Sequence, residues 1–527
     1  MVKVSMLCGI SHNLNCIFTC IFMYMLLGSE SAHSEKPGDE GCNNGITLGN
    51  EKSSDKDATE ILRVPVYGNL HKFAYYYTFV NIGNHPQKQM AIIDTGSQLV
   101  NFACRNCSYC GNHVLKNLDP KSSYTASYIT CKSVQCKIVG GKCNPDNSCG
   151  FMQTYSEGSS VHGKYISDVI NFDSAGNERK LISWYNYIGC VNRENDLIYS
   201  QVSNGILGLS KIKNSENASN DQENHDIPAF IEKFLNDHYE EENAIFALCL
   251  SENGGILTIG GYDKSYNIDK LKHQQKGRGL INRTKWIPLI NSDLYVVKMI
   301  RLEFMGDSIK IKNRKFVLDS GTTISILESG LFKKIIGYFQ SLCTTIEYVN
   351  MNNSLFSRNK NPINWINSAE TRVHGFSPKA FPAKINPVVQ EIFFNENYKN
   401  MNTRNIKNDE KQTKIFKCIQ DRNTHNICFS DISNMPSIFL ESDTGEKIEW
   451  LPRSYFLKRN SKKFSTNPNG WWCLGIEEGN LDENILGATF FKGNHLIFNL
   501  HTNKLGKKQT NKILLLGISH GNCPSYV

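Results

Sequence analysis

The chain of 527 residues is 40% hydrophobic and 20% charged, and it carries a formal net charge of +8 at pH 7. This length suits two lobes, each with its own core, better than one domain. The basic residues are scattered and do not interleave with aromatic residues along one stripe. The composition therefore argues against a nucleic-acid partner.

The N-terminus has the pattern of a secretory signal peptide. Lys3 precedes the apolar stretch 17–27, and small residues follow at 28–32. A membrane anchor is the alternative, but about 11 apolar residues fall short of the roughly 20 that a span needs. We therefore predict that residues 1–32 are a signal peptide. Residues 33–62 are polar and poor in apolar residues, which predicts a leader or pro-segment without a core.

The cysteines indicate an oxidising compartment. Of the 18, three lie in the predicted signal peptide and Cys42 lies in the leader, which leaves fourteen, an even number that suits complete pairing. Cys107 and Cys110 form a C-x-x-C pair, so a metal site is the alternative. No histidine pair lies nearby at the spacing of zinc ligands, and we predict disulfides and no metal. No later run is long enough to span a bilayer, so a soluble lumenal or secreted product is expected.

From residue 63 on, short runs of β-branched and aromatic residues alternate with Gly, Asn and Asp, which predicts an all-β fold. Two stretches, 227–238 and 328–343, have apolar residues at helical spacing and predict short helices. Polar, Asn-rich insertions occupy residues 211–225 and about 350–415, and a short helix is possible at 385–394. The clearest strand-like runs are 62–68, 75–83, 88–96, 163–172, 254–261, 315–323, 436–442 and 494–500.

The chain contains an internal duplication. The run AIIDTGS at 91–97 has a counterpart, FVLDSGT, at 316–322, and each copy precedes an apolar run with glycine, at 205–209 and 485–491. A single Asp-Thr-Gly is most often a β-turn, but two copies on apolar strands predict two related lobes. We place these lobes at 63–262 and 263–527, each supplying one acid.

The two acids, Asp94 and Asp319, suit acid–base chemistry if they meet. Two carboxylates a few ångströms apart cannot both ionise cheaply, so such a pair holds one proton. One acid can then activate water while the other polarises a carbonyl group. The turn glycines and the neighbouring hydroxyl groups would support the pair through backbone and side-chain hydrogen bonds. These supporting residues are Thr95, Gly96, Ser97, Ser320, Gly321 and Thr322.

These motifs resemble those of the pepsin-like aspartic proteases over about residues 63–527. The resemblance implies a bilobal all-β fold with a cleft between the lobes, and a monomeric endopeptidase that acts on polypeptides without a cofactor. It implies that Asp94 and Asp319 are the catalytic acids and that Tyr155 is the tyrosine of the hairpin flap over the substrate. The family commonly has Trp seven residues after the first acid. Asn101 stands there, so we expect the flap tyrosine to lack its indole partner.

Seven cysteines between Asp94 and Tyr155 resemble the cystine-rich insert of nepenthesin-type proteases and of the plasmepsin V-type proteases of malaria parasites and related apicomplexans. The segments FACRNCSYCGNH and GNCPSYV extend the second likeness. Proteases of that branch carry a membrane tail after the final cysteine, which this sequence does not contain. The resemblance implies the disulfides Cys104–Cys190, Cys107–Cys110, Cys131–Cys143, Cys136–Cys149, Cys249–Cys523, Cys343–Cys418 and Cys428–Cys473.

The same branch implies a protease of the endoplasmic reticulum that processes exported or secreted proteins after an Arg-x-Leu motif. An arginine side chain requires carboxylate or carbonyl acceptors. Glu157, beside the flap tyrosine, and Gln201, in the loop before 205–209, are the candidates, although a solvated hairpin charge is the alternative for Glu157. Two other functions stay open: a general protease of acidic compartments, and a non-catalytic protein on the same scaffold, which would usually lose one acid or its glycine.

Overall fold

The computed structural model describes ten stretches of the chain, and all of them belong to one compact unit, Thr59–Val527. The predicted signal peptide, nearly all of the leader, most of the insertion at 211–225 and the insertion at 350–415 with its short helix lie outside the described residues. The described stretches are 61–172, 183–211, 229–267, 284–290, 292–349, 416–422, 424–459, 470–479, 484–500 and 514–526.

Most of the described secondary structure is β-strand, which confirms the all-β prediction. Each of the eight predicted strand-like runs contains a strand. In the first two strands, buried and half-buried residues alternate, because successive side chains point to opposite faces of a sheet. The strands form three sheets, of 15, eight and five strands.

The 15-stranded sheet joins both ends of the chain. Its strands are β1 (Leu62–Gly68), β2 (Tyr76–Ile82), β3 (Gln87–Asp94), β4 (Asn101–Ala103), β5 (Ser127–Tyr128), β6 (Lys142–Cys143), β7 (Cys149–Thr154), β8 (Ser160–Phe172), β9 (Ser183–Glu194), β10 (Gly205–Gly208), β11 (Ile245–Leu250), β12 (Gly255–Ile259), β13 (Lys285–Pro288), β27 (Asn494–Asn499) and β28 (Leu515–His520). The order is β13-β28-β27-β11-β12-β1-β2-β3-β10-β4-β9-β8-β7-β6, and β5 pairs with β8.

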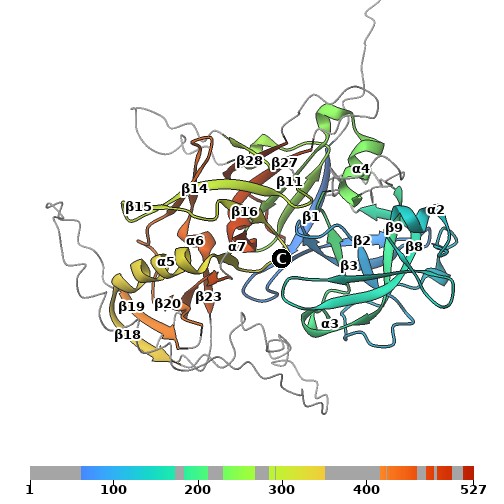
Figure 1. Ribbon diagram of the computed structural model, residues 1–527, viewed down its shortest axis with the longest axis horizontal. Helices are drawn as coiled ribbons and strands as arrows, with labels where there is room; N and C mark the ends of the chain where they lie inside the picture. The colour runs from blue at the N-terminus through green and yellow to red at the C-terminus, as the bar shows by residue number, and fades with distance from the viewer. Residues whose placement is uncertain are drawn as a thin grey trace, which may run out of the picture. The chain divides into compact units, whose positions relative to one another are not determined.

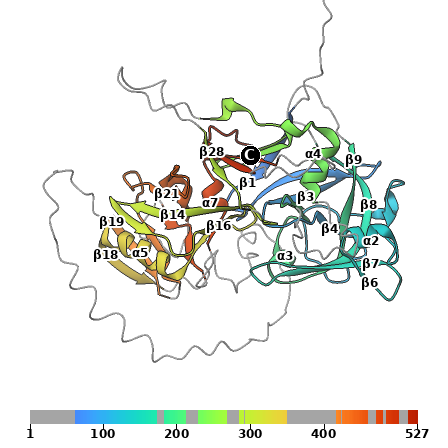
Figure 2. The same cartoon turned by 45° about the horizontal axis from the view of Figure 1, so that its top comes forward.

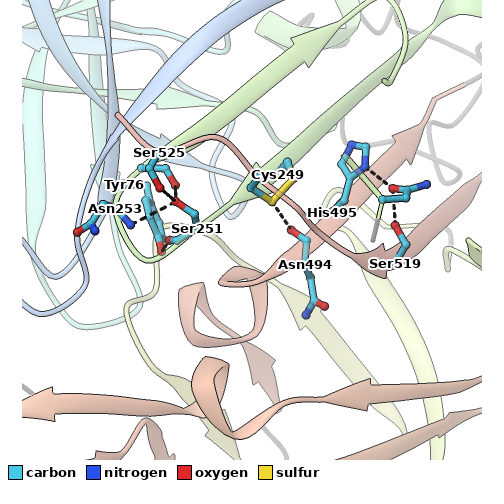
Figure 3. Close-up of a disulfide and its surroundings, with 11 residues drawn as sticks. Tyr76, Cys249, Ser251, Asn253, Asn494, His495, Ser519 and Ser525 are labelled. Atoms are coloured by element: carbon cyan, nitrogen blue, oxygen red, sulfur yellow. Dashed lines mark hydrogen bonds between the residues drawn. A yellow bond between two sulfur atoms is a disulfide. The ribbon is translucent and has the colours of Figure 1, made fainter. Parts of the chain in front are cut away.

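Strands from the C-terminal end of the chain join the sheet of the predicted N-terminal lobe, which ends at residue 262. β27 pairs antiparallel with β11, and β28 pairs with β27. Figures 1 and 2 both show the blue strand β1 and the red strand β28 in the same region. The disulfide Cys249–Cys523 closes this junction (Figure 3). One continuous sheet therefore contains strands from both halves of the chain.

The other two sheets are formed by the C-terminal half. The eight-stranded sheet contains β14 (Val296–Phe304), β15 (Asp307–Lys310), β16 (Lys315–Leu318), β17 (Ser325–Leu327), β21 (Ile438–Ser442), β22 (Lys447–Trp450), β25 (Ile476–Glu478) and β26 (Ile485–Leu486). The five-stranded sheet contains β18 (Cys343–Val349), β19 (Phe416–Asp421), β20 (Ile427–Phe429), β23 (Phe456–Arg459) and β24 (Trp471–Leu474).

The helices are short, and the two predicted from periodicity are confirmed as α4 (Phe230–His238) and α5 (Ser329–Ser341). Phe230 and Phe234 of α4 pack edge-on against Trp184 of β9. Helix α5 buries its apolar face and lies against β18 and β20 (Figure 1). None of the helices within the described stretches is long and apolar enough to cross a membrane. The other α-helices are α2 (Val134–Ile138), α3 (Asp196–Ser200), α6 (Pro452–Tyr455) and α7 (Ala488–Phe491).

Seven disulfides cross-link the described residues. Four of them lie in the N-terminal half, where Cys136 and Cys149 form the centre of a small apolar cluster. Among the described residues, no group of histidine, cysteine or acidic side chains is arranged to hold a metal ion. The bonded pairs, which are those that the resemblance implies, are Cys104–Cys190, Cys107–Cys110, Cys131–Cys143, Cys136–Cys149, Cys249–Cys523, Cys343–Cys418 and Cys428–Cys473.

A buried histidine lies close to the Cys249–Cys523 bridge. His495 is fully buried, and its Nδ1 lies 2.8 Å from Oδ1 of Asn267, which also accepts from the Ser519 hydroxyl (Figure 3). Its Nε2 has no hydrogen-bond partner among the described residues. Burial lowers the pKa of His495 to about 4, although the charge of Asp263 opposes this shift.

We predict that His495 makes the fold sensitive to acid. Because its pKa in the folded state is below the ordinary value near 6.5, the unfolded state binds the proton more tightly, and stability falls as pH drops from about 6.5 to about 4. The expected loss is about 3 kcal/mol. Urea unfolding at pH 7 and pH 4 should show a smaller loss for His495→Gln than for the wild type. Equal losses would contradict the prediction.

Candidate active site

The two predicted acids follow equivalent strands. Asp94 ends β3, which runs parallel to β10 and places Asp94 opposite Gly208. Asp319 directly follows β16, which runs parallel to β26. Each acid therefore directly follows a fully buried residue, Ile93 or Leu318, and lies beside the apolar run with glycine that follows it in the sequence. The duplication in the sequence is a duplication in the structure.

Four buried hydrogen bonds join the two turns. The N–H of Thr95 donates to Oγ of Ser320 at 3.0 Å, and the N–H of Ser320 donates to Oγ1 of Thr95 at 2.9 Å. The Thr95 hydroxyl donates to the carbonyl of Leu318 at 3.0 Å, and the Ser320 hydroxyl donates to that of Ile93 at 2.7 Å. These hydroxyl groups hold the two turns to each other, whereas the sequence suggested only that they lie beside the acids.

Each turn also supplies hydrogen bonds to both oxygens of its own carboxylate: to the inner oxygen, Oδ1, which is the nearer one to the glycine of the opposite turn, and to the outer oxygen, Oδ2. In both turns the glycine two residues after the acid donates its N–H to Oδ1, at 2.8 Å, and the following hydroxyl residue donates to Oδ2. Such donors fix the orientation of a carboxylate. The donors are Gly96 and Ser97 for Asp94, and Gly321 and Thr322 for Asp319.

The two glycines allow the acids to meet. A Cβ atom at Gly96 would lie 2.6 Å from Oδ1 of Asp319, and one at Gly321 would lie 2.4 Å from Oδ1 of Asp94. No side chain fits at these distances, so only glycine lets each turn approach the acid of the other.

The carboxyl groups form a coupled pair. Asp94 is 5% exposed, and burial together with the charge of Asp319 raises its pKa to about 8. The hydrogen bonds from Ser97 and Gly96 oppose this shift. The pair therefore holds a proton at neutral pH, which allows one carboxyl to donate while the other accepts.

A cavity of about 830 Å³ opens beside Asp319. Its lining includes Gly96 from the first turn and Ser156, the residue after Tyr155. The cavity therefore reaches from the acid pair to the hairpin that carries Tyr155.

That hairpin is formed by β7 and β8, which pair antiparallel up to Thr154 and Ser160. Tyr155 opens the turn, and its N–H donates to the carbonyl of Ser159 at 2.9 Å. Burial and the charge of Asp94 raise the pKa of Tyr155 well above its ordinary value. The hairpin thus brings the phenol of Tyr155 within the electrostatic influence of the acid pair.

Asn101 takes over the hydrogen bond that an indole would make. The indole is absent, as expected, but the buried Nδ2 of Asn101 donates to the Tyr155 hydroxyl at 3.3 Å. The ring of Phe151 occupies the adjacent space: a Cβ atom at Gly189 would lie 2.7 Å from that ring and 3.0 Å from Cβ of Asn101. The flap tyrosine therefore lacks the indole but still has a hydrogen-bond donor, Asn101.

The structure shows few contacts for the side chains of Glu157 and Gln201, the two residues predicted to accept hydrogen bonds from arginine. Glu157 is exposed in the flap turn, where its carboxylate accepts a hydrogen bond from the Ser159 hydroxyl. Gln201 ends α3, and its N–H donates to the carbonyl of Ile198 at 3.2 Å. Its own carbonyl lies 3.0 Å from Nδ1 of His113. These contacts fix the backbone of Gln201 and do not assign a role to its side chain.

Sequence reasoning missed His113 and its partner Glu194, a buried pair beside this site. The only signal was a histidine three residues after the C-x-x-C pair, which carries little information without a known partner. The sequence shows Asn101 only as the residue at a position where tryptophan is common in the resembling family.

Residues 76–261 match the family described as Xylanase inhibitor N-terminal. The chain is 27% identical to Plasmepsin V of Plasmodium falciparum over 488 residues, which cover 85% of this chain and 72% of that protein. The chain is thus similar to pepsin-like aspartic proteases. Two further aspartic proteases are similar over shorter stretches. Aspartic protease 5 of Toxoplasma gondii is 32% identical over 39% of this chain and 21% of that protein, and Aspartic proteinase nepenthesin-1 of Nepenthes gracilis is 29% identical over 19% and 23%.

We predict that Asn101 and Tyr155 act as a pair. Asn101→Leu keeps the side-chain volume and removes the donor, which should lower kcat/KM for a peptide substrate about tenfold. The same change in a Tyr155→Phe background should cost little, because the hydroxyl is already gone. Steady-state kinetics on the four proteins measures this coupling. Equal losses in both backgrounds would show that the two side chains act independently.

Proposed function

We propose that the chain is an aspartic endopeptidase in which Asp94 and Asp319 are the catalytic acids. One observation carries the proposal: two carboxyl groups from duplicated turns lie close together in a buried site, where burial and the charge of Asp319 raise the pKa of Asp94 to about 8. The similarity to proteins named as aspartic proteases supports it. Both acids and both turn glycines are present, which disfavours the non-catalytic alternative.

In this mechanism the singly protonated pair acts on water and peptide together. The ionised carboxylate accepts a proton from water while the oxygen of that water attacks the peptide carbonyl carbon. The protonated carboxyl donates to the carbonyl oxygen, and the resulting tetrahedral intermediate breaks its C–N bond as the amine gains a proton. Ser97 and Thr322 hold the outer oxygens, so that the inner oxygens face the reactants.

We further propose that the substrates are secretory-pathway polypeptides cut after Arg-x-Leu, in the lumen of the endoplasmic reticulum. The similarity to Plasmepsin V and the disulfides support this proposal. Glu157, two residues beyond Tyr155, carries an exposed carboxylate that can accept from a guanidinium, and the side chain of Gln201 is a second acceptor. A pair that keeps its proton to about pH 8 favours work near neutral pH over the alternative of an acidic compartment.

The catalytic proposal predicts an upper pH limit and loss of activity without the pair. Above about pH 8, kcat/KM should fall as the pair loses its proton. Asp94→Asn should lower kcat by about 10³-fold or more at every pH, because the amide cannot exchange the proton. Peptide cleavage followed by mass spectrometry from pH 4 to pH 10 tests both results. Equal turnover by the variant and the wild type would remove the pair from the mechanism.

The specificity proposal predicts a selective effect of Glu157. Glu157→Gln keeps the shape and removes the charge, so kcat/KM for an Arg-x-Leu peptide should fall by about 10- to 100-fold. A peptide with citrulline in place of arginine should be cut equally by variant and wild type. Glu347→Gln, at an exposed position on β18, is the matched control. If Glu157→Gln slows both peptides alike, Glu157 does not read the arginine.

A further inference from the structure

The loop that carries the Cys107–Cys110 bridge is fastened to the segment that ends in Gln201. We call residues 104–118 the cystine loop. The N–H of Glu194 donates to the carbonyl of Tyr109 at 2.8 Å, and the N–H of Val114 donates to that of Val202 at 3.0 Å. The rings of Tyr109 and Tyr199 stack at 5.0 Å. The cystine loop therefore contacts the end of β9, helix α3 and the residues that follow it.

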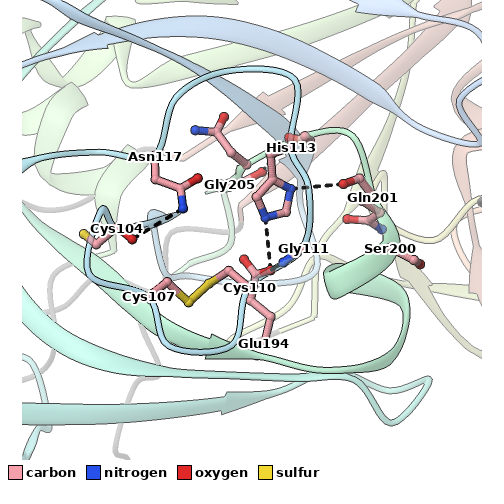
Figure 4. Close-up of polar contacts among 12 residues, drawn as sticks. Cys104, Cys107, Cys110, Gly111, His113, Asn117, Glu194, Ser200, Gln201 and Gly205 are labelled. Carbon is pink, nitrogen blue, oxygen red and sulfur yellow. Dashed lines mark hydrogen bonds and ion pairs between the residues drawn. A yellow bond between two sulfur atoms is a disulfide. The ribbon is translucent and has the colours of Figure 1, made fainter. Parts of the chain in front are cut away.

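His113 lies at the centre of these contacts (Figure 4). Its side chain is 0% exposed, and that of Glu194 is 2% exposed. Nδ1 of His113 is 3.0 Å from the Gln201 carbonyl, and Nε2 is 3.0 Å from Oε2 of Glu194. The same carboxylate oxygen accepts from the N–H of Gly111 at 3.1 Å. One imidazole thus joins the cystine loop to both ends of the segment 194–201.

The partners of His113 define its proton count. A carbonyl oxygen only accepts, so Nδ1 must carry a proton. An ionised carboxylate also only accepts, so Nε2 carries a second proton, and the pair consists of imidazolium and carboxylate. The equivalent form, neutral imidazole and protonated carboxyl, has the same number of protons. Either form satisfies every polar atom of this contact without a net buried charge.

The segments that His113 joins also contact the flap. An apolar cluster packs the flap tyrosine together with residues of the cystine loop and with Val202. The side chain of Asn195 accepts from the N–H of Ser160, at the start of β8. The charge of Glu194 contributes to the raised pKa of Tyr155. Among its members are Cys110, Leu115, Tyr155, Ile198 and Val202.

We propose that His113 is a positioning residue for substrate recognition. By bonding the carbonyl of Gln201 and the carboxylate of Glu194, it sets where the Gln201 side chain meets a basic substrate side chain. This inference rests on the proposed role of Gln201 as an acceptor for arginine. It gives the cystine loop a function in specificity, in addition to stabilising the fold.

To separate positioning from folding, the two proteins that are compared both lack the Glu194 carboxylate. Glu194→Gln is the reference protein: its amide can donate to Nε2 of a neutral His113, which keeps its Nδ1–H bond to the Gln201 carbonyl. Adding His113→Phe removes both bonds, keeps an aromatic ring and leaves no unpaired carboxylate. Circular dichroism establishes that each protein is folded at the assay temperature. If the Phe variant does not fold, Glu194→Gln with His113→Leu, which also removes both bonds, makes the same comparison.

The readout is the ratio of kcat/KM for an arginine peptide to that for its citrulline counterpart, with kcat and KM measured separately. Loss of His113 from the reference should reduce this ratio about tenfold, through KM for the arginine peptide. An unchanged ratio in the folded double variant would overturn the inference.

Two controls distinguish this failure from failure of the proposed function. Gln201→Ala should reduce the wild-type ratio at least as much as loss of His113 does, and an unchanged ratio there would overturn the inference through its premise. A wild type that cuts both peptides equally would overturn the arginine specificity and the inference together. Catalysis itself is judged separately, by Asp94→Asn.

Discussion

The reciprocal hydrogen bonds between Thr95 and Ser320 are the constraint on which the rest of the site depends. Both side chains are fully buried, so their hydroxyl groups must find partners inside the protein. They find them in the opposite turn, and this fixes the distance between the two halves at the acids. The carboxyl groups are then held together in a buried site although their charges repel, and burial together with this repulsion raises the pKa of Asp94.

Beside this centre, the N-terminal half supplies the flap hairpin and the side chains that contact Tyr155. Where an indole is common in the family, Asn101 supplies the donor to Tyr155, and Phe151 occupies the space beside it. The cystine loop is held by the buried contact between His113 and Glu194 in addition to backbone hydrogen bonds. The flap tyrosine thus receives its hydrogen bond from a single side chain, Asn101, while the acid pair rests on a duplicated pattern.

Much of the fold could be predicted from local sequence, because strand alternation and helical spacing are local signals. The acids were predicted because each copy of the motif repeats both residue types and spacing. The hydrogen bonds between Thr95 and Ser320 could not be predicted, because these residues lie 225 positions apart and their contact depends on how the two halves meet. The role of Asn101 and the pairing of His113 with Glu194 depend in the same way on side-chain packing, which no spacing rule encodes.

The central claim is that Asp94 and Asp319 share one proton at neutral pH. Neutron diffraction from a deuterated crystal at pH 7 observes that proton directly. The account predicts one deuteron between the inner oxygens of the two carboxyl groups, with the outer oxygens accepting from Ser97 and Thr322. Two ionised carboxylates with no deuteron between them, or two fully protonated carboxyl groups, would contradict it.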